Sequence, residues 1–135
     1  MKFPSYYNAD AILILHDEFD ITNVFMLGLE KNGFHVVGFT EPLLALEHFQ
    51  KNSKQYGLVI SDLRMPVMNG YQFIKKVKKL KPQIKIFCMS AFEIDYTQFR
   101  TELPFIDIDE FIQMPIRLED FVMTVKKTFS DQRST

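Results

Sequence analysis

Two carboxylates in this sequence stand directly after apolar runs, where a charged side chain is unusual. Asp62 ends the stretch LVISD (58–62), and Asp17 follows the run AILIL (11–15) after one histidine, His16. Taken alone, Asp62 is more typical of a turn, because Asp is common in turns for local hydrogen-bonding reasons. If both runs are neighbouring strands of a parallel sheet, their carboxyl ends meet at the edge where ligands bind.

Facing carboxylates repel each other and raise each other's pKa unless a cation lies between them. Oxygen ligands suit a hard ion, and Mg²⁺ typically takes one or two carboxylates and keeps several waters. Asp17 and Asp62 therefore predict a magnesium-assisted carboxylate nucleophile. A hydroxyl group is expected at the same edge, because Ser90 follows the apolar run IKIFCM (84–89).

The elements that must position these residues are predicted from hydrophobic periodicity. Apolar runs predict strands at 11–15, 34–39, 58–60, 84–89 and 108–112. Helical spacing predicts helices at about 21–32, 40–49, 71–80, part of 93–100 and 118–129. Thr40 is predicted to be the N-cap of the second helix, because Pro42 follows it. The segment 101–109 has no clear pattern. Five strand-helix repeats predict an α/β fold, a parallel sheet with helices on both faces.

Composition narrows the class of protein. A chain of 135 residues with 47% hydrophobic residues fits one folded domain, here 11–129, between an N-terminal extension (1–10) and a polar tail (130–135). A net charge of −1 gives no reason to expect nucleic acid or an anionic membrane as a partner. The lysine-rich stretch 75–85 is interpreted as a solvated helix face. The single cysteine, Cys88, excludes an internal disulfide, and we expect a cytoplasmic protein.

The stretch around Asp62 resembles the receiver domain of two-component response regulators. The family pattern is an aspartate, then Met-Pro at the third and fourth positions after it and Gly at the eighth, and Asp62, Met65, Pro66 and Gly70 match it. The order of the elements agrees over about 11–129. This resemblance implies a flavodoxin-like three-layer fold with strand order 2-1-3-4-5. It also implies that a sensor histidine kinase transfers a phosphoryl group to Asp62.

The resemblance implies further roles. Asp17, Asp62 and the backbone carbonyl of Arg64 would hold Mg²⁺, and Ser90 would contact the phosphoryl group beside the small Ala91. Phe111 would be the aromatic residue that changes rotamer on activation, and the Met114-Pro115 bond would be cis. The face made by the fourth helix, fifth strand and fifth helix would contact a downstream protein or a second copy.

Two positions depart from the family pattern and make the chain an atypical variant. His16 stands where the first of two acidic residues is usual, which removes a charge from the metal pocket and predicts weakened magnesium dependence. Met114 stands where the family has lysine, and a thioether has neither charge nor donor. We therefore expect weakened coupling of phosphorylation to a change of shape.

Four alternatives remain open at this point. The first is a pseudo-receiver that works through constitutive protein contacts. A phosphohydrolase is disfavoured because Arg64 stands where such enzymes usually have a second acid, so we expect no enzyme. Flavin or dinucleotide binding is disfavoured because HDEFD (16–20) replaces a glycine-rich loop. A transition-metal site of His16, Asp17 and Asp62 is disfavoured because three scattered ligands are a weak signature. The chain is expected to be either a single-domain regulator or a fragment of a larger protein.

Overall fold

The computed structural model describes residues 10–93 and 95–133, and the predicted extension therefore lies almost wholly outside the described residues. The sheet consists of β1 (Ala11–Leu15), β2 (Val36–Phe39), β3 (Tyr56–Asp62), β4 (Lys85–Ser90) and β5 (Glu110–Gln113). All pairings are parallel, in the order β2-β1-β3-β4-β5. The predicted flavodoxin-like α/β fold and strand order are confirmed.

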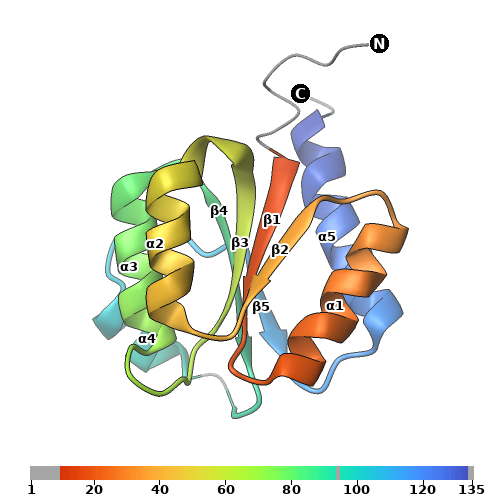
Figure 1. The fold of residues 1–135 in the computed structure, drawn as a ribbon. Helices are drawn as coiled ribbons and strands as arrows, with labels where there is room; N and C mark the ends of the chain where they lie inside the picture. Colours follow the sequence, from red (N-terminus) through yellow and green to blue (C-terminus); the bar gives the residue numbers. More distant parts are fainter. Residues whose placement is uncertain (1–9, 94, 134–135) are drawn as a thin grey trace.

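Helices cover both faces of the sheet, as Figure 1 shows. The helices are α1 (Phe19–Lys31), α2 (Pro42–Asn52), α3 (Gly70–Leu80), α4 (Tyr96–Glu102) and α5 (Leu118–Arg133), with a short 3-10 helix, η2 (Ser53–Gln55). Helices α1 and α5 lie on one side, and α2, α3 and α4 on the other. The sheet is therefore the middle layer of three.

Each face of the sheet has its own hydrophobic core. On one face, Leu13 and Val59 pack with residues from α2 and α3 such as Phe49 and Phe73. On the other face, Ile14 and Ile60 belong to the cluster that α1 and α5 cover. The central strands are apolar throughout because both of their faces are buried.

The structure corrects several predicted boundaries. Thr40 is not the N-cap of α2; Glu41 holds that position, and its side chain makes no capping hydrogen bond. Strand β5 begins at Glu110 rather than 108. The preceding residue, Asp109, binds β4 through both backbone and side chain: its N–H donates to the Ile86 carbonyl and its Oδ2 accepts from Ile86 N–H, each at 2.8 Å. Strand β3 is longer than 58–60, β2 is shorter than 34–39, and α5 extends into the predicted tail.

Two further observations concern the burial of the cysteine and the length of the helices. Cys88 is fully buried, and burial raises the pKa of its thiol, which makes the thiol unreactive at neutral pH. Within the described part of the chain, no helix has the length and apolar character needed to cross a membrane.

Candidate functional site

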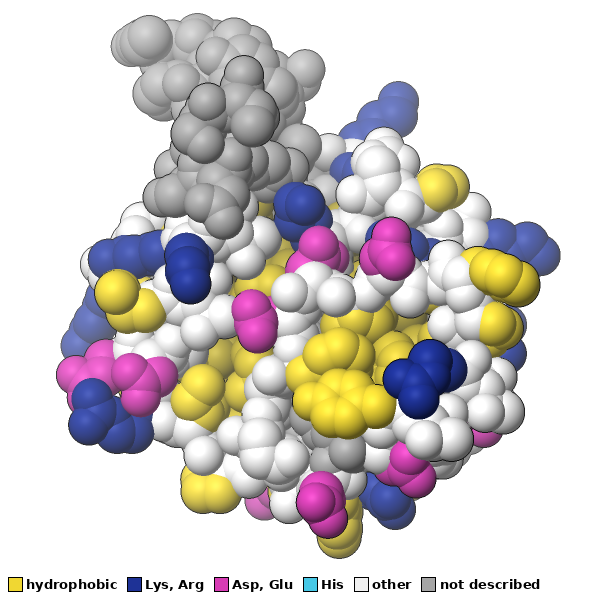
Figure 2. All heavy atoms as spheres, turned by 180° about the vertical axis from the view of Figure 1, so that it is seen from behind, with side chains coloured by type: hydrophobic (Ala, Val, Ile, Leu, Met, Phe, Trp, Pro, Cys, Tyr) yellow, Lys and Arg dark blue, Asp and Glu magenta, His cyan; other side chains and the backbone are white. Residues whose placement is uncertain are grey.

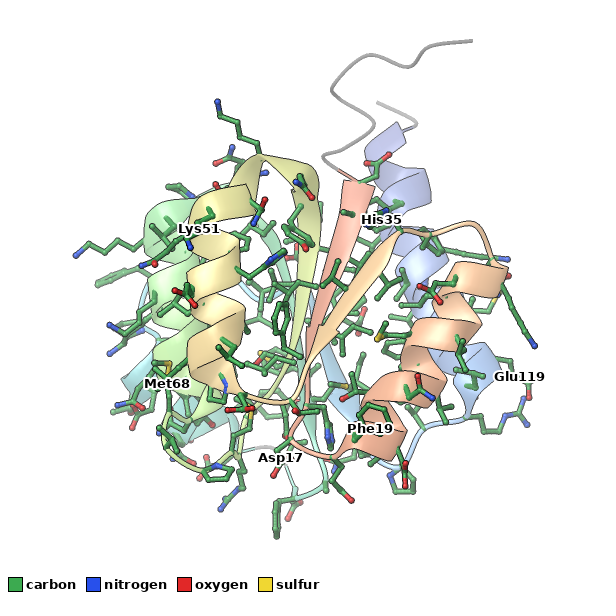
Figure 3. The ribbon with its side chains drawn as sticks, viewed as in Figure 1. Asp17, Phe19, His35, Lys51, Met68 and Glu119 are labelled. Carbon is green, nitrogen blue, oxygen red and sulfur yellow. The ribbon has the colours of Figure 1, made fainter. Side chains whose placement is uncertain are left out.

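The site lies at the carboxyl ends of β1 and β3. These strands are neighbours, and Leu15 is in register with Ser61, so the residues that follow β1 adjoin Asp62. Asp62 pairs with Met89 of β4 on its other side, which brings Ser90 to the same edge. In Figure 3, Asp17 lies at this end of the sheet and His35 at the opposite end.

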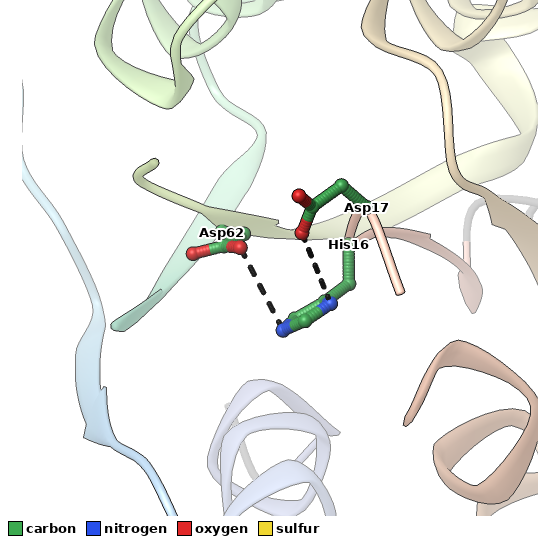
Figure 4. A group of neighbouring side chains, drawn as sticks. All are labelled: His16, Asp17 and Asp62. Atoms are coloured by element: carbon green, nitrogen blue, oxygen red, sulfur yellow. Dashed lines mark ion pairs between the residues drawn. The ribbon is translucent and has the colours of Figure 1, made fainter. Parts of the chain in front are cut away.

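His16, Asp17 and Asp62 form a compact cluster (Figure 4). One ligand atom from each residue lies within 4.8 Å of the others. His16 Nδ1 is 3.6 Å from Asp17 Oδ1, and His16 Nε2 is 3.6 Å from Asp62 Oδ2. The structure therefore brings together the two carboxylates that the sequence paired, with an imidazole in contact with both.

Backbone and side-chain hydrogen bonds fix the His16 ring and its main chain. Glu18 N–H donates to His16 Nδ1 at 3.1 Å, and the Thr22 hydroxyl donates to the His16 carbonyl at 3.0 Å. The ring is 5% exposed. Because Nδ1 accepts a hydrogen bond, we assign the proton of the neutral ring to Nε2, which faces Asp62.

Asp62 is a buried carboxylate, only 7% exposed. Burial raises its pKa above the ordinary value, and the nearby charge of Asp17 also raises it. The positive charge of His16, when its ring is protonated, and the backbone N–H groups of Arg64 and Leu63 lower the pKa of Asp62, with Arg64 N–H 3.4 Å from Oδ1. A carboxylate that is costly to ionise and close to a second carboxylate favours binding of a cation.

The loop after β3 is held close to the strand by Gly70. A Cβ atom at this position would collide with the Asp62 carbonyl oxygen and come within 2.6 Å of Leu63 Cα. Gly70 N–H donates to the Leu63 carbonyl at 3.0 Å. The glycine of the sequence motif is therefore required for close approach of α3 to the end of β3. Pro66, also in the motif, accepts a 2.8 Å hydrogen bond from Met68 N–H in this loop.

Ser90 ends β4 and is 3% exposed. Its hydroxyl donates to the Phe92 carbonyl at 2.8 Å and accepts from Phe92 N–H at 3.0 Å. The Arg64 guanidinium lies over the Phe92 ring, 4.6 Å from the ring centre. The loops that follow β3 and β4 are thus joined across the site by one cation–π contact.

The residues after β5 approach the site through the backbone. Met114 N–H donates to the Ser90 carbonyl at 2.7 Å, and the Met114-Pro115 bond is cis, as expected. The Met114 side chain packs against the apolar cluster beneath α1 and α5. Phe111 is partly buried and meets Phe99 and Tyr96 edge to face, with ring centres 4.8 and 5.1 Å apart.

Sequence reasoning missed three contributors to the site. The Arg64 side chain was considered only as an argument against a phosphohydrolase, although a cation two residues after the central aspartate was a usable signal. Gln113 Nε2 donates to the Phe92 carbonyl at 2.9 Å and the Ser90 carbonyl at 3.1 Å. Thr22, which supports His16, carries no motif and had no signal.

Comparison with known proteins identifies the family. The family model of the response regulator receiver domain matches residues 12–126, and the chain belongs to this family. The response regulator receiver protein CpdR of Brucella abortus is 26% identical over 116 residues, which cover 86% of this chain and 93% of CpdR. Some other relatives are longer, and the match spans 13% of the sensor kinase CckA of the same organism.

Solved structures agree with this assignment. A receiver domain protein of Methanospirillum hungatei superposes with a TM-score of 0.81 at 21% identity, covering 93% of this chain and 97% of that one. The response regulator TrrA of Thermotoga maritima, solved in complex with Mg²⁺ and beryllium fluoride, has a TM-score of 0.72 at 25% identity, covering 87% and 97% of the two chains.

Proposed function

We propose that this chain acts in two-component phosphorelay signalling and accepts a phosphoryl group on Asp62 from a sensor histidine kinase. The observation that carries the proposal is the position of Asp62: it is buried at the carboxyl end of the central strand β3, with a second carboxylate and a hydroxyl group at the same edge. Ser90 is the hydroxyl group that contacts the transferred phosphoryl group.

The transfer is a displacement at phosphorus. A carboxylate oxygen of Asp62 attacks the phosphorus atom of the phosphohistidine, and the bond from phosphorus to the imidazole nitrogen breaks. The nitrogen keeps the electron pair, and Asp62 becomes an acyl phosphate. The β3–α3 loop holds the Asp62 carboxylate for this attack through the Arg64 N–H, which lies 3.4 Å from Oδ1.

The donor set fits a hard divalent cation. Asp17 and Asp62 offer carboxylate oxygens, and the Arg64 backbone carbonyl completes the expected protein ligands. When bound, Mg²⁺ supplies positive charge that offsets the carboxylates and the phosphoryl oxygens. His16 contributes an imidazole where a third carboxylate would contribute charge, so we expect weaker magnesium binding than in a site with an acidic pair.

The direct test is the intact mass of the protein after incubation with acetyl phosphate, with and without Mg²⁺. Wild type should gain one phosphoryl group only with Mg²⁺, and Asp62→Ala should gain none. Asp107→Ala is a control at a carboxylate outside the site and should behave as wild type. A folded wild-type protein that gains no phosphoryl group overturns the proposal.

A second function, a phosphorylation-independent pseudo-receiver, is favoured by two observations. The imidazole of His16 lies 3.6 Å from each of the two carboxylates, and Met114 packs into the apolar cluster instead of presenting a cation to the site. In that case the fold serves as a protein-binding module. The same mass measurement distinguishes the two functions, because a pseudo-receiver gains no phosphoryl group under any condition.

Output is proposed to pass through the face made by α4, β5 and α5, to a downstream protein or a second copy of this chain. Seen from the β5 side, hydrophobic side chains gather in the middle of the molecule (Figure 2). Tyr96 is half exposed, and its ring contacts the Phe111 ring edge to face. Phe105 is fully exposed but lines a hollow with Lys75 and Lys79 of α3, so it supports a different surface.

A further inference from the structure

A cavity of about 280 Å³ opens between the loops that follow β3 and β4. Ser90 and Arg64 line it, together with three acidic residues, Glu93, Asp95 and Glu102. Among the described residues that line it, Arg64 is the only lysine or arginine. The charge in this cavity is therefore predominantly negative, with a single cation available to an incoming anion.

The Arg64 side chain starts beside the nucleophile and ends on the neighbouring loop. Its backbone N–H is 3.4 Å from Asp62 Oδ1, while its guanidinium lies 4.6 Å from the centre of the Phe92 ring. Arg64 is exposed, and Phe92 is 57% exposed. A cation–π contact between exposed partners is weak, so the guanidinium is free to exchange it for a stronger partner.

A phosphoryl group on Asp62 would add negative charge where the strand-end residue Met114 supplies no donor. Its thioether packs against the cluster beneath α1 and α5. Arg117, in the segment after β5, pairs with two acidic residues, with Nη2 3.0 Å from Glu119 Oε1 and Nε 3.3 Å from Asp120 Oδ2. Besides a bound Mg²⁺, the side-chain cation nearest to Asp62 in the sequence is Arg64, which also lines the cavity beside Ser90.

We propose that the Arg64 guanidinium leaves the Phe92 ring and binds the phosphoryl oxygens on Asp62, as the phosphoryl-binding cation of this site. This role rests on the proposed function of Asp62 as acceptor. Arginine suits it because its planar fork donates two parallel hydrogen bonds to phosphate oxygens. A side-chain substitution of Arg64 tests it cleanly, because the backbone carbonyl assigned to the metal is retained.

Movement of the Arg64 guanidinium from the Phe92 ring to the phosphoryl group also affects Ser90. Phe92 binds the Ser90 hydroxyl through both its N–H and its carbonyl group. While Arg64 stacks on Phe92, the two loops are held together and the Ser90 proton is directed at its own loop. Departure of the guanidinium removes that restraint, so that the Ser90 hydroxyl can turn toward the phosphoryl group.

The experiment compares wild type with Arg64→Ala, Arg64→Lys and Phe92→Leu. Arg100→Ala is the control, because Arg100 is an exposed arginine of α4 that does not line the cavity. Two quantities are measured with Mg²⁺: the rate of phosphoryl gain from acetyl phosphate, by intact mass, and the affinity for beryllium fluoride, by calorimetry. Circular dichroism and urea midpoints establish folding, and Arg64→Gln replaces Arg64→Ala if the latter does not fold.

We expect Arg64→Ala to reduce both quantities by about tenfold, as loss of a hydrogen bond to a charged group does. Arg64→Lys should retain most of the phosphorylation rate and most of the affinity for beryllium fluoride. Phe92→Leu should equal or exceed wild type in both quantities, and Arg100→Ala should equal wild type in both.

If Arg64→Ala matches wild type in both quantities, the inference is wrong while the proposed function stands. If Arg64→Lys and Phe92→Leu lose as much as Arg64→Ala, the stack is structural, and the inference is again wrong. If wild type neither gains a phosphoryl group nor binds beryllium fluoride, the proposed function fails and this role with it.

Discussion

The imidazole of His16 contacts both carboxylates of the site, with Nε2 3.6 Å from Asp62 Oδ2 and Nδ1 3.6 Å from Asp17 Oδ1. Glu18 N–H donates to Nδ1, which directs the Nε2 proton of the neutral ring at Asp62. The ring thus points an N–H group at the acceptor carboxylate, at a distance of 3.6 Å that is too long for a direct hydrogen bond. It does so at a position where the receiver family usually supplies a third negative charge.

His16→Asp should therefore strengthen magnesium binding. The added carboxylate brings charge to a pocket that is 5% exposed at this residue, and we expect a gain of roughly tenfold in affinity, about 1.4 kcal/mol. The measurement is the urea midpoint as a function of Mg²⁺ concentration, because a ligand that binds only the folded state raises stability. His16→Asn, which adds no charge, is the matched control. Equal magnesium responses in all three proteins would contradict this prediction.

Met114→Lys should restore a cation to the end of β5. The lysine stem can follow the apolar cluster while the ammonium group reaches the carboxylates. We expect tighter beryllium fluoride binding, and we expect Arg64→Ala to cost less in the Met114→Lys background, because the two cations would serve the same anion. Met123→Lys, at an exposed methionine of α5, controls for net charge. Strictly additive effects of the two substitutions would show that Met114 and Arg64 act on different groups.

The fold could be predicted from the sequence because its central strands are unambiguous. In β1 every residue is buried, and a short apolar run of this kind fits only an element covered on both faces. The edge strand β5 was harder: of Glu110–Gln113 only Ile112 is buried, so its beginning had no apolar signal. Thr40 and Glu41 both precede Pro42, and side-chain preference alone favoured the wrong one as N-cap.

The candidate site was predictable only as far as topology determines it. Strand order brings Asp17, Asp62 and Ser90 to one edge whatever their side chains do. The orientation of His16 and the stacking of Arg64 on Phe92 depend on rotamers and loop paths, which residue spacing does not encode. The orientation of His16 and the stacking of Arg64 on Phe92 could therefore be found only from the structure.

Tyr56→Phe should change the response of stability to alkaline pH. Tyr56 is fully buried, its hydroxyl is 2.6 Å from His48 Nε2, and burial raises its pKa to about 12. In the unfolded chain the side chain of Tyr56 ionises at about pH 10. Below this pH the tyrosine makes its full contribution to the stability of the fold. As the pH rises from 10 toward 12, that contribution falls by at most about 1.4 kcal/mol per pH unit.

At neutral pH, Tyr56→Phe should cost about 1 kcal/mol, because the hydrogen bond to His48 is lost. The gap between the two proteins should then close between pH 10 and 12 and change sign, since the phenylalanine variant has no group to ionise at this position. Urea unfolding at neutral and alkaline pH measures both effects. Tyr96→Phe, at a half-exposed tyrosine, is the control. Parallel stability curves for wild type and Tyr56→Phe would count against a raised pKa.

Phe99→Ala should destabilise the fold rather than probe a surface. Phe99 is 5% exposed and packs on Tyr71 and Phe111, with ring centres 5.4 and 4.8 Å away. Its truncation should cost roughly 3–5 kcal/mol. Tyr96, which is 51% exposed, is the residue that reports on the α4–β5–α5 face.

The two aromatic residues therefore need different measurements. Tyr96→Asp should leave the urea midpoint close to that of wild type and weaken any dimer in sedimentation velocity. Phe99→Ala should lower the urea midpoint strongly. An equal loss of stability in both variants would mean that Tyr96 belongs to the core, and an unchanged sedimentation profile for Tyr96→Asp would remove this face as a dimer surface.

Gly70→Ala should damage the site through the backbone. The added methyl group would collide with the Asp62 carbonyl oxygen and crowd Leu63 Cα, so the start of α3 must move away from the acceptor residue. Gly33→Ala is a matched control: Gly33 has φ +90°, and a Cβ there meets nothing within 4 Å, so it carries only the conformational cost of about 1 kcal/mol. Both variants should lose stability, but only Gly70→Ala should also slow phosphoryl gain from acetyl phosphate at a temperature where both remain folded. Equal phosphorylation rates in the two variants would show that the Asp62 carboxylate tolerates a shift of the loop, and that Gly70 serves the fold alone.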